Sequence, residues 1–387
     1  MTERPWSDAD RHAMARALVL AELGRNTVRP NPMVGCVLVR DAKIVGEGWH
    51  ERAGGPHAEI AALRAGGQAA RGATAYVTLE PCDHTGRTGP CTTALREAGV
   101  AEVVYALDDP DAAAGGGAQS LRAAGIPVRS GLLAEWVETQ NEVFLLTRRA
   151  KRPFLTLKLA QTLDGQLRTP RGVPWITGRT ARTAVHRLRS ESDAVLVGSQ
   201  TVIDDDPALT VRHLDAPRGQ PRAVVLDARG RIGLDAALVT QRGRTDADPP
   251  SLVLTSSAAD AIWCRKLDDA GVEVVVLPAG PRGGVELAAV TGALLERGLH
   301  HVLVEGGETV AREFVSSGLI DRLVLHIALT IVGPFGLPSV TSAATAPDGP
   351  WCWATEKVGH LGRDLEVVVT PNLPACERAG TAGGREA

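Results

Sequence analysis

The sequence predicts an α/β protein made of two domains. Its 387 residues exceed what one core usually supports, since single hydrophobic cores stop growing at about 250 to 300 residues. Short apolar strands alternate with helical segments in both halves, the order that α/β proteins show. A basic segment that ends in proline, 148–153, separates the halves. We expect domains at 1–148 and 149–371 and a disordered tail at 372–387, which lacks hydrophobic periodicity.

The expected elements of the first domain follow from periodicity and capping residues. A helix is predicted over 8–23, with Ser7 as its cap and Gly24 at its end. Strands at 34–40 and 43–49 are separated by two residues, a spacing that suits a hairpin. Helices are then expected from about His57, from about Cys91, near 118–124 and at 134–147, and strands at 74–80, 102–107 and 126–129.

The second domain repeats the α/β pattern without repeating the sequence of the first. Helices are expected between several of its strands, and the strands should form one sheet. The strands are expected at or near 154–160, 193–197, 222–227, 251–255, 273–277, 301–305 and 322–329.

Charge and hydropathy narrow the class of protein. The net charge of −3 gives no basic field for a nucleic-acid backbone, so no nucleic-acid partner is expected. No run approaches 18 consecutive apolar residues, so no membrane span is expected. The first ten residues lack the layout of a secretory signal. We expect a cytoplasmic protein whose partners are small molecules.

One group of residues predicts a catalytic zinc site. His57 opens a predicted helix, Cys82 follows a strand, and Cys91 starts another helix. One imidazole and two thiolates leave the fourth tetrahedral position of zinc open for water, as a catalytic site requires. Glu59, two residues from His57, could move protons between that water and a substrate, which is the chemistry of hydrolytic deamination.

Taken singly, each of these residues has an ordinary structural explanation. His57 alone could be a surface helix start, and either cysteine alone could be an inert core residue. Together they match the zinc-deaminase signature of H-x-E followed by Pro-Cys and a second Cys. Eight residues rather than two separate Cys82 from Cys91, which departs from that signature. Cys36 is expected in the core and His84 is not expected to be a ligand.

The stretch TLEPCDHTGRTGPC, with NPMVGCVLV and GEGWHERAGGPHAE upstream, resembles the deaminase half of the bifunctional riboflavin biosynthesis family over about 8–148. The resemblance implies a cytidine-deaminase-like α/β/α domain with a pocket for a phosphoribosylated diaminopyrimidine. It makes Asn31, His50 and Arg87 candidate substrate contacts, with Arg87 at the phosphate. An Asn-Pro turn, a strand-end histidine and a solvated arginine are the alternatives. Asp83 and Gly89 stand where serine and proline are expected.

The segments LKLAQTLDGQL, VPWITG, VGSQTVIDDDPALTVR and LVEGGETVAREFV resemble, in this order, the reductase half of the same family over about 150–370. The resemblance implies a dihydrofolate-reductase-like α/β fold. No G-x-G-x-x-G motif follows a strand, but the turn from Gly306 to Thr309 opens a helix and could hold a pyrophosphate. A Gly-Gly turn between a strand and a helix can equally be a simple connector.

The resemblance also implies the contacts of the reductase half. Those to NADPH are Ala160, Trp175, Thr201, Asp205, Gly307, Glu308, Thr309, Val310, Ala311, Arg312 and Glu313. Those to the substrate are Val173, where the family often has serine, Arg189, Leu209, Arg212 and Glu305. The two arginines suit a phosphate and the glutamate suits pyrimidine N–H groups, although helix-surface and loop positions would explain them equally. Lys158 and Asp164 could line the same pocket or face outward.

The activity implied by the resemblance has two steps, carried out in a homo-oligomer. The first is zinc-dependent hydrolytic deamination of 2,5-diamino-6-(5-phosphoribosylamino)pyrimidin-4-one. The second is NADPH-dependent reduction of the ribosyl chain to ribityl, which gives 5-amino-6-(5-phosphoribitylamino)uracil. Two alternatives remain: a nucleic-acid deaminase, such as one acting on tRNA adenosine, and a chain in which only one half is active. The long cysteine loop and the second half argue against the former, and the intact ligands and Gly-Gly turn argue against the latter.

Overall fold

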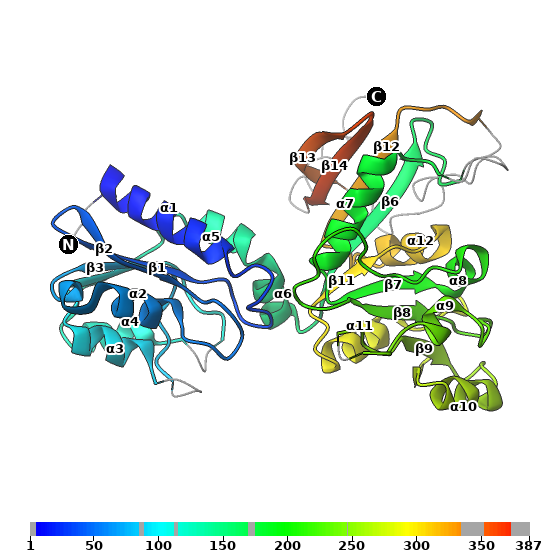
Figure 1. The fold of residues 1–387 in the computed structure, drawn as a ribbon, viewed down its shortest axis with the longest axis horizontal. Coiled ribbons are helices and arrows are strands. Elements are labelled where there is room, and N and C mark those ends of the chain that lie inside the picture. The colour runs from blue at the N-terminus through cyan, green and yellow to red at the C-terminus, as the bar shows by residue number, and fades with distance from the viewer. Residues whose placement is uncertain are drawn as a thin grey trace, which may run out of the picture. The chain divides into compact units, whose positions relative to one another are not determined.

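The protein was studied as a computed structural model, which describes residues 5–84, 89–111, 115–168, 175–245, 247–333 and 352–372. The chain divides into two compact units, residues 1–151 and 152–387. Each unit is built around its own β-sheet, and each is described by itself below (Figure 1).

The first unit contains a five-stranded sheet in the order β2-β1-β3-β4-β5. β1 pairs antiparallel with β2 and β3, whereas β3, β4 and β5 run parallel. The predicted hairpin is confirmed: Asp41 and Ala42 form its turn with φ angles of +50° and +58°, the left-handed conformation that a two-residue turn requires. The strands are β1 Gly35–Arg40, β2 Lys43–Trp49, β3 Thr74–Leu79, β4 Glu102–Leu107 and β5 Val128–Ser130.

Helices cover both faces of this sheet. Val77 of β3 packs in the cluster that α2, α3 and α4 bury, while its neighbour Tyr76 packs in the cluster that α1 and α5 bury. This alternation is what a strand buried on both faces requires. The helices are α1 Asp8–Glu22, α2 Ala58–Gly66, α3 Cys91–Ala98, α4 Gly117–Ala123, α5 Ala134–Gln140 and α6 Glu142–Ala150, with a short 3-10 turn at Gly67–Ala70.

The first helix begins where its capping residue predicts. Ser7 Oγ accepts a hydrogen bond from Asp10 N at 3.1 Å, and Asp10 Oδ2 accepts one from Ser7 N at 2.8 Å. Such a reciprocal cap satisfies backbone donors that a helix start leaves open. Tyr76 donates its hydroxyl hydrogen bond to the other Asp10 oxygen at 2.7 Å, so the cap also joins α1 to the sheet.

The helix expected at 134–147 is in fact two helices, α5 and α6, which meet at Asn141. Asn141 leaves helical geometry with φ −105° and ψ +18°. Its Oδ1 accepts from Met33 N at 2.7 Å, and its Nδ2 donates to Met33 O at 3.0 Å. Because these bonds fix the side chain against a segment 108 residues earlier, they favour a break that local periodicity does not reveal.

The second unit contains one sheet, as predicted. It has nine strands, in the order β10-β9-β8-β7-β11-β6-β12-β14-β13. The seven strands that stand first in this order, from β10 across the sheet to β12, run parallel to one another. β14 pairs antiparallel with both β12 and β13. The strands are β6 Phe154–Thr162, β7 Ala194–Gly198, β8 Arg222–Leu226, β9 Leu252–Ser256, β10 Glu273–Leu277, β11 His301–Val304, β12 Arg322–Ala328, β13 Trp353–Leu361 and β14 Asp364–Pro371. The β13–β14 hairpin was not predicted, because most of β13 is exposed and lacks a regular apolar face.

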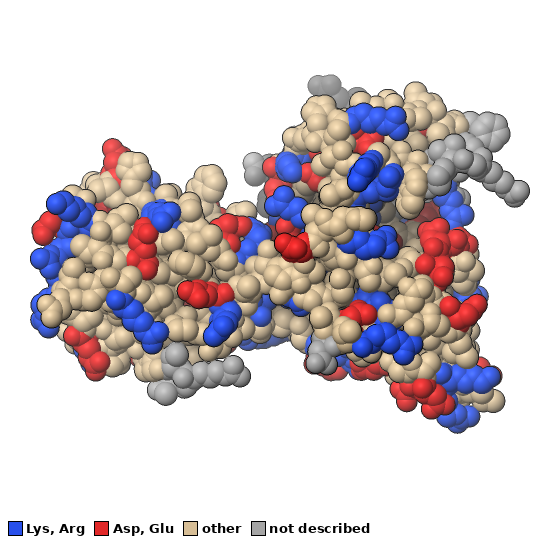
Figure 2. All heavy atoms as spheres, viewed as in Figure 1, with Lys and Arg blue, Asp and Glu red and all other residues tan. Residues whose placement is uncertain are grey.

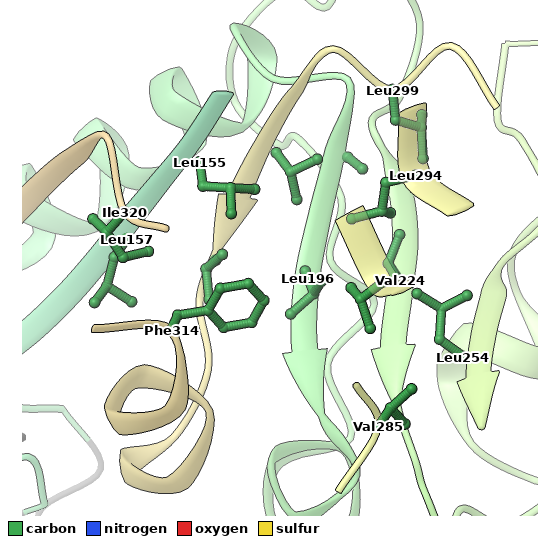
Figure 3. Close-up of a cluster of buried hydrophobic side chains, with 14 of the residues drawn as sticks. Leu155, Leu157, Leu196, Val224, Leu254, Val285, Leu294, Leu299, Phe314 and Ile320 are labelled. Carbon is green, nitrogen blue, oxygen red and sulfur yellow. The ribbon is translucent and has the colours of Figure 1, made fainter. Parts of the chain in front are cut away.

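Two apolar clusters hold helices against this sheet. α11 and α12 pack on one face, where Phe314 is fully buried (Figure 3). Burying one such side chain contributes about 2 to 3 kcal/mol. α8, α9 and α10 pack on the other face. The helices are α7 Arg179–Ser190, α8 Ser199–Asp205, α9 Ala237–Thr240, α10 Ala261–Asp269, α11 Leu287–Glu296 and α12 Glu308–Ser316.

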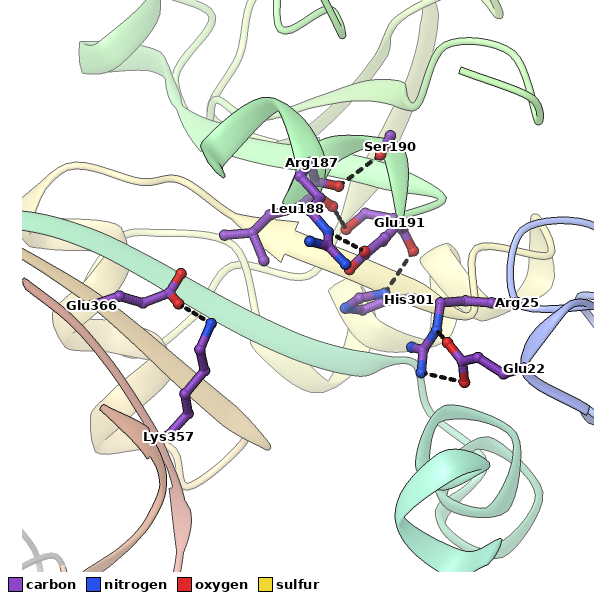
Figure 4. Close-up of polar contacts among 10 residues, drawn as sticks. Glu22, Arg25, Arg187, Leu188, Ser190, Glu191, His301, Lys357 and Glu366 are labelled. Carbon is purple, nitrogen blue, oxygen red and sulfur yellow. Dashed lines mark hydrogen bonds and ion pairs between the residues drawn. The ribbon is translucent and has the colours of Figure 1, made fainter. Parts of the chain in front are cut away.

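Polar contacts tie α7 to the central strands of the second unit. Arg187 and Glu191 form an ion pair across one helical turn at 3.1 Å, and a ring nitrogen of His301 lies 3.0 Å from the Glu191 carbonyl (Figure 4).

On the face drawn in Figure 2, basic and acidic side chains are interspersed over both units. Within the described part of the chain, no helix has the length and apolar content needed to cross a membrane.

Candidate active sites of the two units

The structure brings His57, Cys82 and Cys91 together in the first unit. His57 is the N-cap of α2, Cys82 follows β3, and Cys91 is the first residue of α3. His57 Nδ1 lies 3.4 Å from Cys82 Sγ and 3.3 Å from Cys91 Sγ, and the three ligand atoms all lie within 4.8 Å of one another. Both helix starts direct their positive dipole ends toward the thiols, which favours thiolates.

These separations fit zinc. A tetrahedral ion with Zn–S bonds of about 2.3 Å and Zn–N bonds of about 2.1 Å separates its nitrogen and sulfur ligands by about 3.6 Å. Hydrogen bonds from Cys91 and from His57 hold the pKa of the Cys82 thiol well below its ordinary value, at about 4. The same hydrogen bond to Cys82, together with burial, raises the pKa of the Cys91 thiol. Cys82 and Cys91 are buried, and the site therefore offers two sulfur atoms and one imidazole out of bulk water. That donor set is characteristic of zinc in proteins.

Glu59 lies in the first turn of α2 beside this cluster and is 3% exposed. Burial raises the pKa of its carboxyl above the ordinary value. A carboxyl group whose pKa is raised toward neutrality can both accept and return a proton at physiological pH. Glu59 is therefore suited to acid-base work next to the metal ligands.

A cavity of about 490 Å³ opens onto this cluster, a volume in the range of small-molecule sites. Asn31 and His50 line it, together with the ligand His57 and with His84, which is not part of the ligand cluster among the described residues. His50 Nδ1 lies 2.9 Å from Pro56 O, and His50 Nε2 lies 3.1 Å from Asn31 Nδ2. The Pro56 carbonyl can only accept a hydrogen bond, so His50 Nδ1 carries the proton and donates it. His50 Nε2 then accepts from the Asn31 amide nitrogen, which leaves Asn31 Oδ1 for a ligand.

The long loop between the cysteines is anchored at its first residues. Asp83 accepts hydrogen bonds from Thr92 Oγ1 of α3 at 2.5 Å and from Ser120 Oγ of α4. The aspartate that replaces the expected serine thus joins the start of the loop to two helices. Arg87, the sequence candidate for a phosphate contact, lies outside the described residues. The predicted core position of Cys36 is confirmed, because it is fully buried among apolar side chains.

Several cavity residues were not found from the sequence, and four of them lie after β4 or on α6. Asp109 and Asp111 follow β4, and Phe144 and Arg148 lie on α6. Burial raises the pKa of Asp109. None of the four belongs to a recognisable motif, and α6 follows the zinc ligands by more than 50 residues in the sequence. In the sequence, Arg148 and Arg149 at the end of α6 indicate only a domain boundary.

In the second unit, the Gly306–Gly307 turn joins β11 to α12, with Gly307 as the N-cap. Gly307 has φ −66°, so it does not need the left-handed backbone that glycine favours. A Cβ at Gly306 would lie 2.5 Å from Val310 Cβ, whereas a Cβ at Gly307 would meet Thr201 Oγ1 at 3.5 Å. The first glycine is therefore required by helix packing, and the second keeps space open beside an expected NADPH contact.

The remaining expected NADPH contacts lie at several strand and helix ends. Ala160 lies on β6, Thr201 and Asp205 lie on α8, and the side chain of Trp175 is exposed, with the Arg182 guanidinium 4.8 Å from its ring. The other expected contacts belong to the first turns of α12 and include Thr309 and Val310. Ala311 is fully buried. Arg312 pairs with Glu308 at 3.6 Å, and Glu313 pairs with Arg282.

Two of the expected substrate residues of the second unit are paired with each other. Arg189 Nε donates to Glu305 Oε1 at 2.6 Å, and Nη2 donates to Oε2 at 2.8 Å. Lys158 lies near this pair, and burial lowers the pKa of its ammonium. Leu209 is 2% exposed, so almost none of the residue is accessible, whereas Arg212 is exposed. Val173 lies outside the described residues.

Comparison with known proteins assigns each unit to a family. Residues 7–107 match the model of the cytidine and deoxycytidylate deaminase zinc-binding region, and residues 153–362 match that of the RibD C-terminal domain. The riboflavin biosynthesis protein RibD of Aquifex aeolicus is 39% identical over 93% of this chain and 98% of its own length. RibD of Escherichia coli is also 39% identical, over 92% of this chain and 98% of its own.

Solved structures agree along nearly the whole chain. Acinetobacter baumannii RibD has a TM-score of 0.82 and 35% identity, and the match covers 94% of this chain and 99% of that one. A Thermotoga maritima diaminohydroxyphosphoribosylaminopyrimidine deaminase/5-amino-6-(5-phosphoribosylamino)uracil reductase has a TM-score of 0.78 and 33% identity, with the same coverage. The resemblance inferred from the motifs is thereby confirmed for both halves. The chain belongs to the RibD family of riboflavin biosynthesis proteins and carries both a zinc-binding deaminase domain and a reductase domain.

Proposed function

We propose that the first unit deaminates 2,5-diamino-6-(5-phosphoribosylamino)pyrimidin-4-one and that the second reduces the product with NADPH to 5-amino-6-(5-phosphoribitylamino)uracil. The observation that carries this proposal is the cluster of His57, Cys82 and Cys91, whose two thiols are buried, beside Glu59 and a cavity large enough for a nucleotide-sized ligand. The family of the chain supports the order of the two steps. We further propose that it acts in the cytoplasm on small molecules, as a homo-oligomer.

In the deaminase step, Glu59 moves the protons. A zinc ion held by His57, Cys82 and Cys91 would supply Lewis-acid activation of the attacking water. Glu59 accepts a proton from the water that adds to the amino-bearing ring carbon and passes it to the ring nitrogen. It then takes the remaining proton of the new hydroxyl group and gives it to the amino group, which departs as ammonia and leaves a carbonyl. Asn31 and His50 orient the ring edge, because their hydrogen bond fixes both side chains.

In the reductase step, positioning is the main task of the chain. NADPH would supply a hydride to C1 of the ribose, where the bond from C1 to the ring oxygen breaks and that oxygen takes up a proton, which gives the ribityl chain. The Gly306–Gly307 turn at the start of α12 offers backbone N–H groups to the pyrophosphate. The pair of Arg189 and Glu305, with Lys158 beside it, forms a charged group for the substrate, and Arg212 remains exposed for its phosphate. Domain boundaries at 148/149 and 371/372 are part of this proposal.

The proposal is tested by following the two products separately. Zinc-loaded protein given the diaminopyrimidinone substrate should release ammonia without NADPH, and NADPH oxidation should begin only after deaminated product has formed. A chelated sample should lose ammonia release and still oxidise NADPH when the deaminated compound is supplied. Absence of ammonia release from a zinc-replete sample would refute the deaminase assignment, and absence of NADPH oxidation with the deaminated compound would refute the reductase assignment.

A further inference from the structure

The cavity of the first unit has an uneven distribution of charge. Beside the zinc ligands and Glu59 it is lined by three more carboxylates, Glu80, Asp109 and Asp111. Arg148 is the one lysine or arginine among the described residues that line it. A ligand that carries a phosphate therefore meets several negative charges and a single described guanidinium.

The fold does not use the Arg148 guanidinium for a close contact. In the described structure its nearest partner is Asp111, with Nη1 3.7 Å from Oδ2, and its side chain is 41% exposed. It lies 5.5 Å from the Phe144 ring one turn earlier on α6. Its neighbour Arg149 points to a different partner, since Arg149 Nη1 donates to Glu138 Oε1 at 2.8 Å.

Glu80 and Asp109, by contrast, have structural partners. Glu80 accepts hydrogen bonds from Ala118 N at 2.9 Å and from Asp109 N at 3.4 Å. Asp109 Oδ1 accepts one from Asp111 N at 2.9 Å. These bonds hold the two carboxylates in the cavity wall, so a ligand cannot readily displace them. Arg148, whose contact with Asp111 is 3.7 Å long, is the charged side chain of the wall that can change its partner.

We propose that Arg148 binds the phosphate group of the deaminase substrate, exchanging Asp111 for the phosphate when the substrate enters. This inference rests on the proposed function, from which it takes a phosphorylated substrate. A guanidinium can form two parallel hydrogen bonds to phosphate oxygens, which is a stronger arrangement than a carboxylate at 3.7 Å without a hydrogen bond. The Phe144 ring restricts the arginine side chain, so less freedom is lost when it binds.

Arg149 provides a matched control. Both arginines occupy the last turn of α6 and interact equally with its dipole, but Arg149 does not line the cavity. We expect Arg148→Met to raise KM for the phosphorylated substrate by about 10- to 100-fold, the loss of one or two charged hydrogen bonds, with kcat within a few-fold. Arg149→Met should change neither constant, and Arg148→Lys should recover part of the lost affinity.

The dephosphorylated substrate separates phosphate binding from a structural role. Parent and Arg148→Met should have similar KM values for it, because the proposed partner is missing. An equal rise in KM for both substrates, or no rise for the phosphorylated one, would overturn the proposal. Zinc content and melting temperature, measured on the same samples, should be those of the parent.

A binding measurement keeps the inference independent of turnover. Calorimetric titration with ribose 5-phosphate should show one site fewer per chain in Arg148→Met than in the parent or in Arg149→Met. Equal stoichiometry and affinity in the three proteins would overturn the assignment even if the deaminase were inactive. If the parent protein does not deaminate the substrate but Arg148→Met still loses the ribose 5-phosphate site, the proposed reaction is wrong and the phosphate site stands.

Discussion

Arg189 near the end of α7 and Glu305 at the end of β11 form a two-point ion pair although 116 residues separate them. Their side chains are 12% and 13% exposed, and Arg189 Nη1 also donates to Thr210 O at 3.0 Å. Both carboxylate oxygens of Glu305 are thus occupied by Arg189. If the substrate binds here as proposed, it meets the pair as a unit rather than an arginine and a glutamate acting separately.

Glu305→Gln should destabilise the protein by about 2 to 4 kcal/mol, because it leaves the buried Arg189 charge without its partner. The double variant Arg189→Met, Glu305→Gln should lose less than the sum of the two single effects. Urea unfolding of the parent, both single variants and the double variant measures this coupling. Strictly additive losses would show that the ion pair contributes nothing beyond its separate side chains.

Glu59→Gln should lower the rate of ammonia release by at least about 100-fold, because the amide keeps the shape of the carboxyl but cannot carry a proton. Zinc content should stay at that of the parent, since Glu59 is not one of the three ligands. Reduction of supplied deaminated substrate should persist. Ammonia release at the parental rate would remove Glu59 from the proton-transfer role.

The two glycines of the β11–α12 turn should respond differently to substitution. Gly307→Val should raise the NADPH dissociation constant by about 10-fold or more while the protein stays folded, because its side chain extends toward Thr201 and the cofactor space. Gly306→Ala should cost about 1 to 3 kcal/mol of stability, because its Cβ collides with Val310. Fluorescence titration with NADPH and thermal melting of both variants test this. Unchanged NADPH affinity in a folded Gly307→Val protein would show that the turn only connects β11 to α12 and does not bind the cofactor.

His326 should make the second unit sensitive to acid. It is fully buried on β12, its Nε2 lies 3.5 Å from Glu366 Oε1, and Glu366 in turn pairs with Lys357 (Figure 4). Burial, with the positive charge of Lys158, lowers the pKa of His326 to about 4. Because the unfolded imidazole takes up a proton at about pH 6.5 and the folded one does not until about pH 4, stability is lost as the pH falls through this window.

The loss attributable to His326 should amount to at most about 3 kcal/mol between pH 7 and pH 4. His326→Leu removes the titrating group and should flatten this part of the pH dependence. Free energies of unfolding at pH 7 and at pH 4.5 for parent and variant provide the comparison. Parallel pH profiles for the two proteins would contradict the assignment.

Local patterns predicted both sheets and the three residues, His57, Cys82 and Cys91, that the structure brings together. The Asp41–Ala42 hairpin could be predicted because strand spacing limits the turn to few geometries, and His57 could be found because a metal site repeats a short motif. The break at Asn141 could not be predicted, since its partner is Met33. Arg148 could not be found for the same reason: which side chains line a cavity depends on packing between distant segments.

The two hydrogen bonds between Asn141 and Met33 also have a dynamic consequence. Met33 follows Asn31 in one wall of the deaminase cavity, and Asn141 precedes Phe144 and Arg148 in another. One amide occupies both backbone groups of Met33, as a neighbouring strand would. Separating these walls must first break both bonds, so we expect the segment around Met33 and the start of α6 to move together.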